Sequence, residues 1–435
     1  MLRLLYNLLL HLALPWLWLR LRLRGRREPG YLEDIGQRFG RYDERPDGPV
    51  IWLHAVSLGE TRAAQPLVAA LRERYPGHAL LVTHMTATAR AAARELYGAH
   101  ATLAFLPYDL PWAARRFVAH FRPQLGILME TEVWPNLLAA CRDARVPVLL
   151  ANARLSARSA RGYARAGALA REAFGALAAA GAQSEADAAR IRALGTAAVE
   201  VTGNLKFDVA PAPGYEAKAR EFRGWFGPRR VFLAASTRDG EEALLLDALD
   251  RQRPDPDVLT VVVPRHPQRF DEVGRLITGR DRVLARRSDA RRVPAECRYL
   301  LGDSLGEMSA YYAAADVAFV GGSLVPLGGQ NLIESLAVGT PVLIGPSSFN
   351  FAQAVEEAVR AGACVQVAGA DVLVQEARRL LADPGARARM AAAGRAFCAA
   401  HRGATARTLG LVTRLLPGAD AAAADRATPT RRSAP

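Results

Sequence analysis

The chain has 435 residues, a length at which one hydrophobic core usually gives way to two, so two domains are expected. Half of the residues are hydrophobic and 23% are charged, which is ordinary for a globular protein. The formal net charge of +14 suits nucleic acid, an anionic membrane or an anionic substrate, but no lysine-rich tail and no basic strip with interleaved aromatic residues accompanies it, so no nucleic-acid partner is expected.

The first 27 residues are predicted to be a membrane anchor followed by an arginine cluster. Residues 4–19 are almost wholly apolar, interrupted only by Asn7 and His11, and are slightly shorter than the about 20 residues of a full span. No A-x-A-like cleavage site follows, and five arginines do, at positions 20, 22, 24, 26 and 27. This order indicates an uncleaved anchor whose downstream side stays in the cytoplasm. A buried core helix is the alternative.

Beyond Pro49, short apolar runs alternate with amphipathic helical stretches on both sides of a proline-rich break at residues 209–214. The alternation predicts an α/β fold with two doubly wound parallel sheets and a cleft between them. The expected strands are 50–56, 79–84, 102–106, 125–129, 146–151 and 199–201, then 231–235, 258–263, 299–302, 317–320 and 341–344. The expected domains are residues 28–210 and 215–416, and residues 417–435 are expected to be a disordered tail.

Ligands of open parallel sheets bind beyond the carboxyl ends of the strands, and the unusual residues of the first half cluster there. Glu60 starts a helix directly after the first strand, where a carboxylate can cap the helix, sit as an anion without a catalytic role, or act as a general base. Glu130 and Glu132 directly follow an apolar strand. They form either a solvated capping pair or a buried pair, and burying two acids is costly unless they have a function or a partner. Lys206 brings a cation to the same edge.

The strand ends of the second half carry donors and small residues. Arg265 and His266 close the apolar strand 258–263. Residues 328–334 (GGQNLIE) open a helix, where glycines allow close backbone approach and free N–H groups can receive phosphate. A lone G-G-x-N is usually a turn and cap, but the paired architecture and the preceding P-R-H favour a nucleotide site.

No metal site is predicted. Residues 255–257 have the D-x-D form of metal-dependent sugar transferases, but they precede a strand, at the wrong end of the sheet for a ligand, so a turn is expected. The four cysteines form no C-x-x-C pair, which argues against a zinc site or a disulfide framework.

Together these motifs resemble the 3-deoxy-D-manno-octulosonic-acid (Kdo) transferase family of lipopolysaccharide synthesis, from the amino-terminal anchor to about residue 415. The matching segments are residues 54–60 (HAVSLGE), 129–136 (METEVWPN), 151–159 (ANARLSARS), 203–208 (GNLKFD), 264–266 (PRH) and 321–334 (GGSLVPLGGQNLIE). The resemblance implies a GT-B fold, with two Rossmann-like domains facing a central cleft. It also implies CMP-Kdo as the donor, a lipid A precursor as the acceptor, no cofactor, and a site at the cytoplasmic side of the bacterial inner membrane.

The resemblance also assigns roles to residues. It implies an inverting transferase with Glu60 as the general base, and with Glu130 and Lys206 supporting the transition state. The residues implied to hold CMP are Arg265, His266, Leu305, Gly306, Glu307, Asn331, Leu332, Ile333 and Glu334. Gln330 departs from the family, since many relatives have His there. Two alternatives remain, an envelope GT-B enzyme that uses a UDP-sugar and a membrane-tethered nucleotide-binding protein without catalysis.

Overall fold

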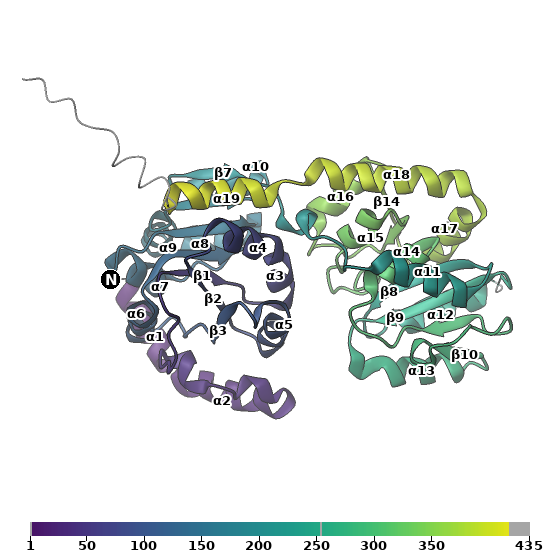
Figure 1. The fold of residues 1–435 in the computed structure, drawn as a ribbon, viewed down its shortest axis with the longest axis horizontal. Coiled ribbons are helices and arrows are strands. Elements are labelled where there is room, and N and C mark those ends of the chain that lie inside the picture. The colour runs from purple at the N-terminus through teal and green to yellow at the C-terminus, as the bar shows by residue number, and fades with distance from the viewer. Residues whose placement is uncertain (1, 253–254, 417–435) are drawn as a thin grey trace, which may run out of the picture. The chain divides into compact units, whose positions relative to one another are not determined.

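The computed structural model describes residues 2–252 and 255–416, which form two α/β units (Figure 1). The first unit contains residues 2–209 and 402–416, and the second contains the described residues of 210–401. Two parallel-sheet domains are therefore confirmed. The expected second domain reached residue 416, whereas the chain returns to the first unit after His401. The predicted tail, residues 417–435, lies outside the described residues.

The first unit is built on a seven-stranded parallel sheet in the order β3-β2-β1-β4-β5-β6-β7. Its strands are β1 (Val50–His54), β2 (Ala79–His84), β3 (Ala101–Phe105), β4 (Pro123–Met129), β5 (Val148–Ala153), β6 (Ala179–Ala182) and β7 (Val199–Val201). All of β1 is buried: Ile51 and Leu53 pack into one core cluster and Trp52 into another. Helices therefore cover the strand from both faces, as the continuous apolar run predicts.

From β1 onward, the helices of the first unit connect successive strands, except for α19, which follows all of the strands. They are α3 (Leu58–Ala63), α4 (Gln65–Arg74), α5 (Ala87–Tyr97), α6 (Pro111–Phe121), α7 (Pro135–Asp143), α8 (Ala157–Arg165), α9 (Ala168–Gly175), α10 (Glu185–Ala193) and, after the second unit, α19 (Ala404–Leu415). The strand order reverses between β1 and β4. This reversal is a topological switch point, where doubly wound sheets bind their ligands.

The second unit repeats the plan with the order β10-β11-β9-β8-β12-β13-β14, and its switch point lies between β8 and β12. Its strands are β8 (Arg230–Thr237), β9 (Val258–Pro264), β10 (Leu284–Arg286), β11 (Tyr299–Leu301), β12 (Val317–Val320), β13 (Val342–Ile344) and β14 (Cys364–Gln366). Its helices are α11 (Tyr215–Phe226), α12 (Glu241–Arg251), α13 (Phe270–Thr278), α14 (Met308–Ala314), α15 (Ile333–Val338), α16 (Ala352–Arg360), α17 (Ala370–Ala382) and α18 (Pro384–His401). The strands β6, β10 and β14 are absent from the sequence-based prediction.

The returning helix α19, yellow in Figure 1, completes the first unit. Its Leu411 and Val412 are buried in the same core cluster as Ile51. Asp208 holds the start of the helix, because its carboxylate accepts hydrogen bonds from the backbone N–H groups of Gly403 (2.8 Å) and Thr405 (2.6 Å). The first sheet is thus covered in part by a helix that follows the whole second unit in the chain.

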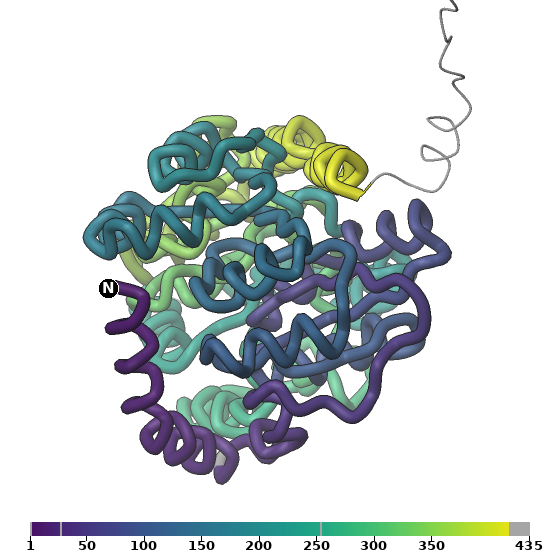
Figure 2. Tube along the Cα trace, turned by 90° about the vertical axis from the view of Figure 1, so that its left-hand side faces the viewer, coloured from purple at the N-terminus to yellow at the C-terminus, as the bar shows by residue number. Residues whose placement is uncertain are grey.

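Two helices precede the first sheet, α1 (Leu2–Leu12) and α2 (Leu14–Arg27), and Figure 2 shows them following one another as a bent pair. In the part of the chain that the structure describes, no single helix has the length and apolar character needed to cross a membrane. The helices Leu2–Leu12 and Leu14–Arg26 meet that requirement only as a pair, and the pair is bent by 47°. The membrane anchor remains a prediction.

Candidate active site

The switch point of the first sheet brings the loop after β1 next to the loop after β4. Ser57 caps α3, with its Oγ accepting a hydrogen bond from the backbone N–H of Glu60 (3.3 Å). The carboxylate of Glu60 turns back to the end of β1, where it accepts from the N–H of Val56 (2.9 Å) and from Ser57 Oγ (2.8 Å). Glu60, the residue predicted from the sequence, therefore places a fixed carboxylate at the edge of the sheet where the strands end.

The electrostatic surroundings of Glu60 bring its ionisation near neutrality. Burial, and after it the neighbouring charge of Glu130, raise the pKa of Glu60 to about 7, against the opposing effect of the hydrogen bonds from Ser57 and Val56. Only 9% of the residue is exposed. A carboxyl with this pKa can be ionised and still take up a proton at neutral pH, which is the property of a general base.

Glu130 and Lys206, the other two predicted residues, form an ion pair at the same edge. Lys206 Nζ lies 3.1 Å from Glu130 Oε1, and both side chains are mostly buried. Glu130 has a positive φ of 58°, a left-handed conformation that costs about 1–3 kcal/mol in residues other than glycine. Glu132 is held apart by Trp134, whose indole N–H donates to it at 2.7 Å. The structure thus gathers Glu60, Glu130 and Lys206, as predicted.

Lys206 is positioned by amide side chains that precede it. It lies in the turn η3 (Leu205–Asp208), where Asn152 Oδ1 accepts from the N–H of Leu205 (3.0 Å) and Asn204 Oδ1 accepts from the N–H of Lys206 (3.0 Å). Asn152 also has a positive φ, 52°. The motifs at residues 151–159 and 203–208 therefore act together to present one ammonium group.

Two histidines near Glu60 have a structural role. His54 Nδ1 lies 2.9 Å from Thr83 Oγ1, and His84 Nδ1 lies 2.9 Å from the carbonyl oxygen of Ala55. Burial lowers the pKa of His54 to about 3 and that of His84 to about 4. Both rings are neutral at physiological pH and join the segment of β1 to β2.

In the second unit, Glu241 joins the two loops of the switch point. Its fully buried carboxylate accepts backbone N–H bonds from Arg238 (2.8 Å), which follows β8, and from Gly322 (2.5 Å), Ser323 (2.9 Å) and Leu324 (2.9 Å), which follow β12. Sequence reasoning missed this residue. The available signal was its place, because an acid at the start of a helix after a strand is the arrangement of Glu60.

Three arginines surround His266 at this edge. Burial lowers the pKa of His266, and the charges of Arg238, Arg265 and Arg269 lower it further. Arg269 is neutralised by the buried Glu242, which receives two of its N–H bonds at 2.8 and 3.1 Å. Arg238 and Arg265 bring positive charge to the same edge, which suits an anionic ligand.

Gln330, the departure from the family pattern, has a defined partner. Its Oε1 accepts a hydrogen bond from Arg265 Nε at 3.2 Å. Within the described part of the chain, the guanidinium of Arg238 makes no hydrogen bond or ion pair, and its Cγ lies 3.5 Å from where a Cβ on Gly322 would be. Arg238 and Arg265 thus flank the glycine loop, and of the two only Arg265 is predicted from the sequence.

The other predicted CMP-binding residues differ in how far their side chains are exposed to solvent. Leu332 and Ile333 are buried in the core, whereas Leu305 is 70% exposed. Asn331 Oδ1 accepts from the N–H of Ile333 (3.1 Å), at the start of the short helix α15. Leu332 and Ile333 can therefore meet a ligand through their backbone only.

The two acids among these residues are already engaged by protein groups. Glu307 receives two hydrogen bonds from Arg287, at 2.8 and 3.0 Å, and follows Gly306, whose φ is 77°. Glu334 Oε1 accepts from Ser309 Oγ at 2.9 Å. The charges of Glu334 and Arg265 both act on the buried Tyr312, whose pKa burial raises. The contact that joins the segment around residue 265 to the loop before α15 is the hydrogen bond from Arg265 to Gln330.

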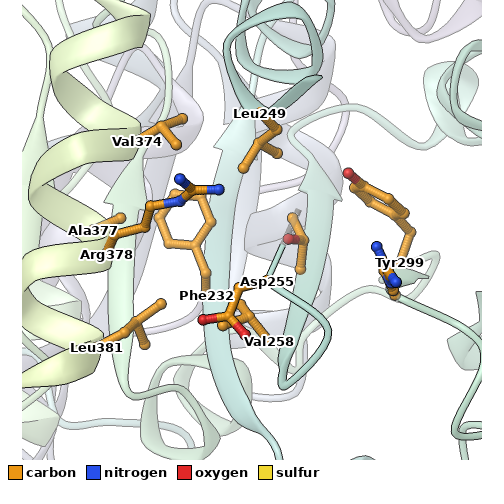
Figure 3. A pocket seen from close by; sticks show the side chains of 11 residues that line it. Phe232, Leu249, Asp255, Val258, Tyr299, Val374, Ala377, Arg378 and Leu381 are labelled. Atoms are coloured by element: carbon orange, nitrogen blue, oxygen red, sulfur yellow. The ribbon is translucent and has the colours of Figure 1, made fainter. Parts of the chain in front are cut away.

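Figure 3 shows a pocket at the opposite edge of the second sheet. It is lined near the starts of the strands by Phe232, Val258 and Tyr299. Asp255 also lines it, paired with Arg230 at 2.9 Å and accepting the N–H of Asp257 at 3.0 Å. The turn expected at residues 255–257 is confirmed. Among the described residues, no group of three or more His, Cys, Asp or Glu side chains is placed to hold a metal ion.

Comparisons with protein families cover both units. The family model for 3-deoxy-D-manno-octulosonic-acid transferase (kdotransferase) matches residues 33–209, and the model for glycosyl transferases group 1 matches residues 244–397. The chain is 47% identical to the 3-deoxy-D-manno-octulosonic acid transferase of Bordetella pertussis, over 93% of this chain and 97% of that protein. It is 34% identical to the enzyme of the same name from Haemophilus influenzae, over 94% and 98%.

Solved structures share the two-domain fold at low identity. The UDP-GlcNAc 2-epimerase from Neisseria meningitidis, bound to UDP-GlcNAc, matches with a TM-score of 0.59 and 14% identity, over 84% of this chain and all of that one. A glycosyltransferase from Rickettsia africae matches with a TM-score of 0.58 and 12% identity, over 86% of this chain and all of that one. At these identities the similarity concerns the fold alone.

Proposed function

This chain belongs to the Kdo transferase family and is a glycosyltransferase, and from that premise we propose that it transfers Kdo from CMP-Kdo to a lipid A precursor with inversion at the anomeric carbon. We also propose that the two units work together as a GT-B enzyme, with the base in the first and the nucleotide-binding residues in the second. The observation that carries the proposal is the buried carboxylate of Glu60, whose pKa burial raises to about 7.

In the proposed reaction the acceptor hydroxyl oxygen forms a bond to the anomeric carbon of Kdo. The bond from that carbon to the phosphate oxygen breaks, and its electron pair leaves with CMP. Glu60 takes the hydroxyl proton. General-base assistance of this kind contributes about 10²–10⁴-fold in rate.

Glu130 and Lys206 are proposed to support this step as a pair. The charge of Glu130 raises the pKa of Glu60 and so strengthens it as a base. Lys206, 3.1 Å from Glu130, adds a cation at the same edge, which suits the negative charge that CMP-Kdo carries. The strained backbone of Glu130 fits a residue that is held for a task.

The second unit is proposed to hold CMP. Arg265 and His266, together with Arg238, suit its phosphate, because they lie beside the glycine loop that Glu241 orders. Glu334 is proposed to accept hydrogen bonds from the ribose. Because the carboxylate of Glu307 is occupied by Arg287, residues 305–307 are proposed to contact CMP through their backbone.

We propose that the reaction needs no metal ion, because cytidine phosphate is already a good leaving group. Activity is therefore expected to survive dialysis against EDTA. The acceptor and the location are proposed on similar chemical grounds. The net charge of +14 and the arginines after residue 19 suit a phosphorylated lipid in the bacterial inner membrane, met from the cytoplasmic side.

The test uses the full chain in detergent, CMP-Kdo generated in place, a tetra-acylated lipid A precursor and mass spectrometry. The wild type is expected to increase the mass of the lipid by whole Kdo units. Glu60→Gln is expected to lose about 10²–10⁴-fold in rate while still binding CMP. Glu73→Gln, at an exposed position of α4, is the matched control and keeps full activity.

Other outcomes would overturn the proposal in different ways. Full activity of Glu60→Gln would remove the assignment of the base. Turnover with a UDP-sugar, and none with CMP-Kdo, would replace the donor. CMP binding without turnover of any donor would indicate a nucleotide-binding protein that is not an enzyme.

A further inference from the structure

We propose that the helix pair α1–α2 lies within one leaflet of an anionic membrane and does not cross the bilayer. The inference rests on the membrane association proposed above and adds how the chain is placed in the membrane. It follows from two opposite faces of the pair, one held by the first unit and one exposed and apolar.

Polar contacts hold the inner face of α1 against the first unit. Tyr6 donates its hydroxyl hydrogen to Asp109 Oδ2 (2.8 Å), and Asn7 Oδ1 accepts from Asn136 Nδ2 (2.8 Å). Arg3 makes a salt bridge with Glu172 at 3.1 Å. A helix surrounded by lipid would have none of these partners.

The buried carboxylate of Asp109 shows that this attachment belongs to the fold. It accepts the backbone N–H groups of Asn136 (3.0 Å) and Leu137 (2.8 Å) as well as the hydroxyl of Tyr6, and only 3% of the residue is exposed. Burial raises the pKa of Asp109 to about 6. Removing Tyr6 would uncover this carboxylate and take away one of its three hydrogen bonds.

The inner face continues along α2. Leu21 and Gly25 are buried, four residues apart as one face of a helix requires. A Cβ on Gly25 would lie 2.2 Å from Leu32 Cγ, so the helix backbone packs closely on the segment that follows it. Protein therefore covers the inner face of the pair from Arg3 to Gly25.

The outer face, which we call the leaflet face, is apolar and exposed. Its side chains recur every three or four residues through the break between the helices: Leu5, Leu8, Leu12, Trp16, Leu19 and Leu23. Leu12, at the break, is 68% exposed. The stripe is continuous along both helices, which fits a flat apolar medium running beside them.

Arginines border the leaflet face on α2. A helix turns by about 100° per residue, so Arg20 and Arg24 lie on one flank of Trp16, Leu19 and Leu23, and Arg22 and Arg26 lie on the other. The guanidinium of Arg20 is 5.2 Å from the ring centroid of Trp16. Long cationic side chains on both borders of an apolar stripe can reach lipid phosphates while the stripe enters the acyl region. This charge pattern favours an anionic leaflet as the partner.

Crossing the bilayer is disfavoured by length and by charge. At 1.5 Å per residue α1 is about 16 Å long and α2 about 21 Å, against about 30 Å of hydrocarbon. Using both helices would place the arginines of α2 near the acyl region and detach Arg3 from Glu172. A charged side chain is costly to insert at the centre of the bilayer.

The test determines on which side of the membrane the amino terminus lies. A cysteine in a short Gly-Ser extension before Met1 is labelled with a membrane-impermeant maleimide in spheroplasts and in inverted membrane vesicles. Arg360→Cys, whose native side chain is 68% exposed, marks the side of the catalytic units. The four native cysteines are buried, so the chain without an added cysteine is the blank.

The expected result is labelling of both cysteines in inverted vesicles and of neither in spheroplasts. Labelling of the extension in spheroplasts would mean that the pair crosses the bilayer, and labelling on neither side would place the terminus inside it. Either result overturns the proposal and leaves the proposed activity intact. Recovery of the whole protein in the soluble fraction would remove the membrane association itself.

Discussion

Glu60 has a pKa that burial and the charge of Glu130 raise to about 7, which sets a pH dependence that a neighbouring substitution can shift. A base must be ionised to act, so kcat/KM is expected to rise with pH up to about 7 and then level off. Glu130→Gln removes one of the two main causes of the raised pKa. We expect the acidic limb of its pH profile to move to lower pH, whatever its maximal rate.

The measurement is kcat/KM for CMP-Kdo between pH 5 and 9. Glu73→Gln is the control, and its profile is expected to match the wild type. An acidic limb that stays in place in Glu130→Gln would show that the charge of Glu130 does not reach the base.

The same pKa predicts a change in stability. The unfolded chain releases the Glu60 proton near the ordinary value of 4.5, whereas the folded chain releases it at about 7. Stability from this group is therefore present at low pH and lost as the pH rises through 7. Glu60→Gln is expected to raise the unfolding free energy of the first unit at pH 8.5 by on the order of 3 kcal/mol, and to change it little near pH 4. Urea unfolding at the two pH values measures this, and an equal effect at both would contradict it.

Glu241 holds together the two loops at the switch point of the second sheet, where CMP is proposed to bind. A glutamine in its place presents an N–H₂ group to backbone N–H donors and leaves some of them without an acceptor. We expect Glu241→Gln to lose about 1–3 kcal/mol of stability and to bind CMP more weakly. Calorimetry with CMP and thermal unfolding test both effects. Glu356→Gln, at an exposed ion pair of the same unit, should change neither.

At the scale of elements, Asp208 lies in a family motif beside Lys206, yet its contacts are with the start of α19. Asp208→Ala removes the acceptor of two backbone N–H groups at a helix start, so a loss of about 1–2 kcal/mol is expected. The first unit should melt earlier while CMP binding stays unchanged. Asp143→Ala, at an exposed position, is the control. Unchanged melting would show that α19 is held by its apolar contacts alone.

The missed strands show which elements a sequence pattern reveals. Runs such as β1 and β9 are long, apolar and buried on both faces, and they were predicted. β10 and β14 have three residues each and lie at the edges of their sheet. β6 reads Ala-Ala-Gly-Ala, which has little strand propensity. Its Gly181 is required by a distant residue, since a Cβ there would lie 2.8 Å from Thr202 Oγ1.

The residues of the candidate site also divide into those that a local sequence pattern reveals and those that it does not. Glu60, Glu130 and Lys206 each follow a strand in the chain and lie in motifs that resemble the Kdo transferase family, and both signals are local in sequence. Glu241 also follows a strand, but three of its partners are more than 80 positions away, in the loop after β12. A residue whose role is to join two distant loops has no local pattern that reveals it.

For the whole molecule, the division of the chain predicts how fragments behave. The second unit is continuous in sequence, so residues 210–401 alone are expected to fold and bind CMP. Residues 1–209 alone lack α19, and the apolar surface that Leu411 and Val412 cover would be exposed at about 1.5–3 kcal/mol for each side chain. We expect that fragment to aggregate. Joining residues 402–416 to it by a flexible linker should restore a cooperative thermal transition, and failure to do so would contradict this account.

The return of α19 to the first unit also fixes an order of events during synthesis. Residues 210–401 leave the ribosome as a complete set, whereas the sheet that carries Glu60 receives its covering helix only after the whole second unit has been synthesised. The unit that is proposed to bind the nucleotide can therefore mature on the nascent chain before the unit that is proposed to carry the base is complete. A truncated translation product that stops before α19 would combine a folded second unit with an unfinished first unit.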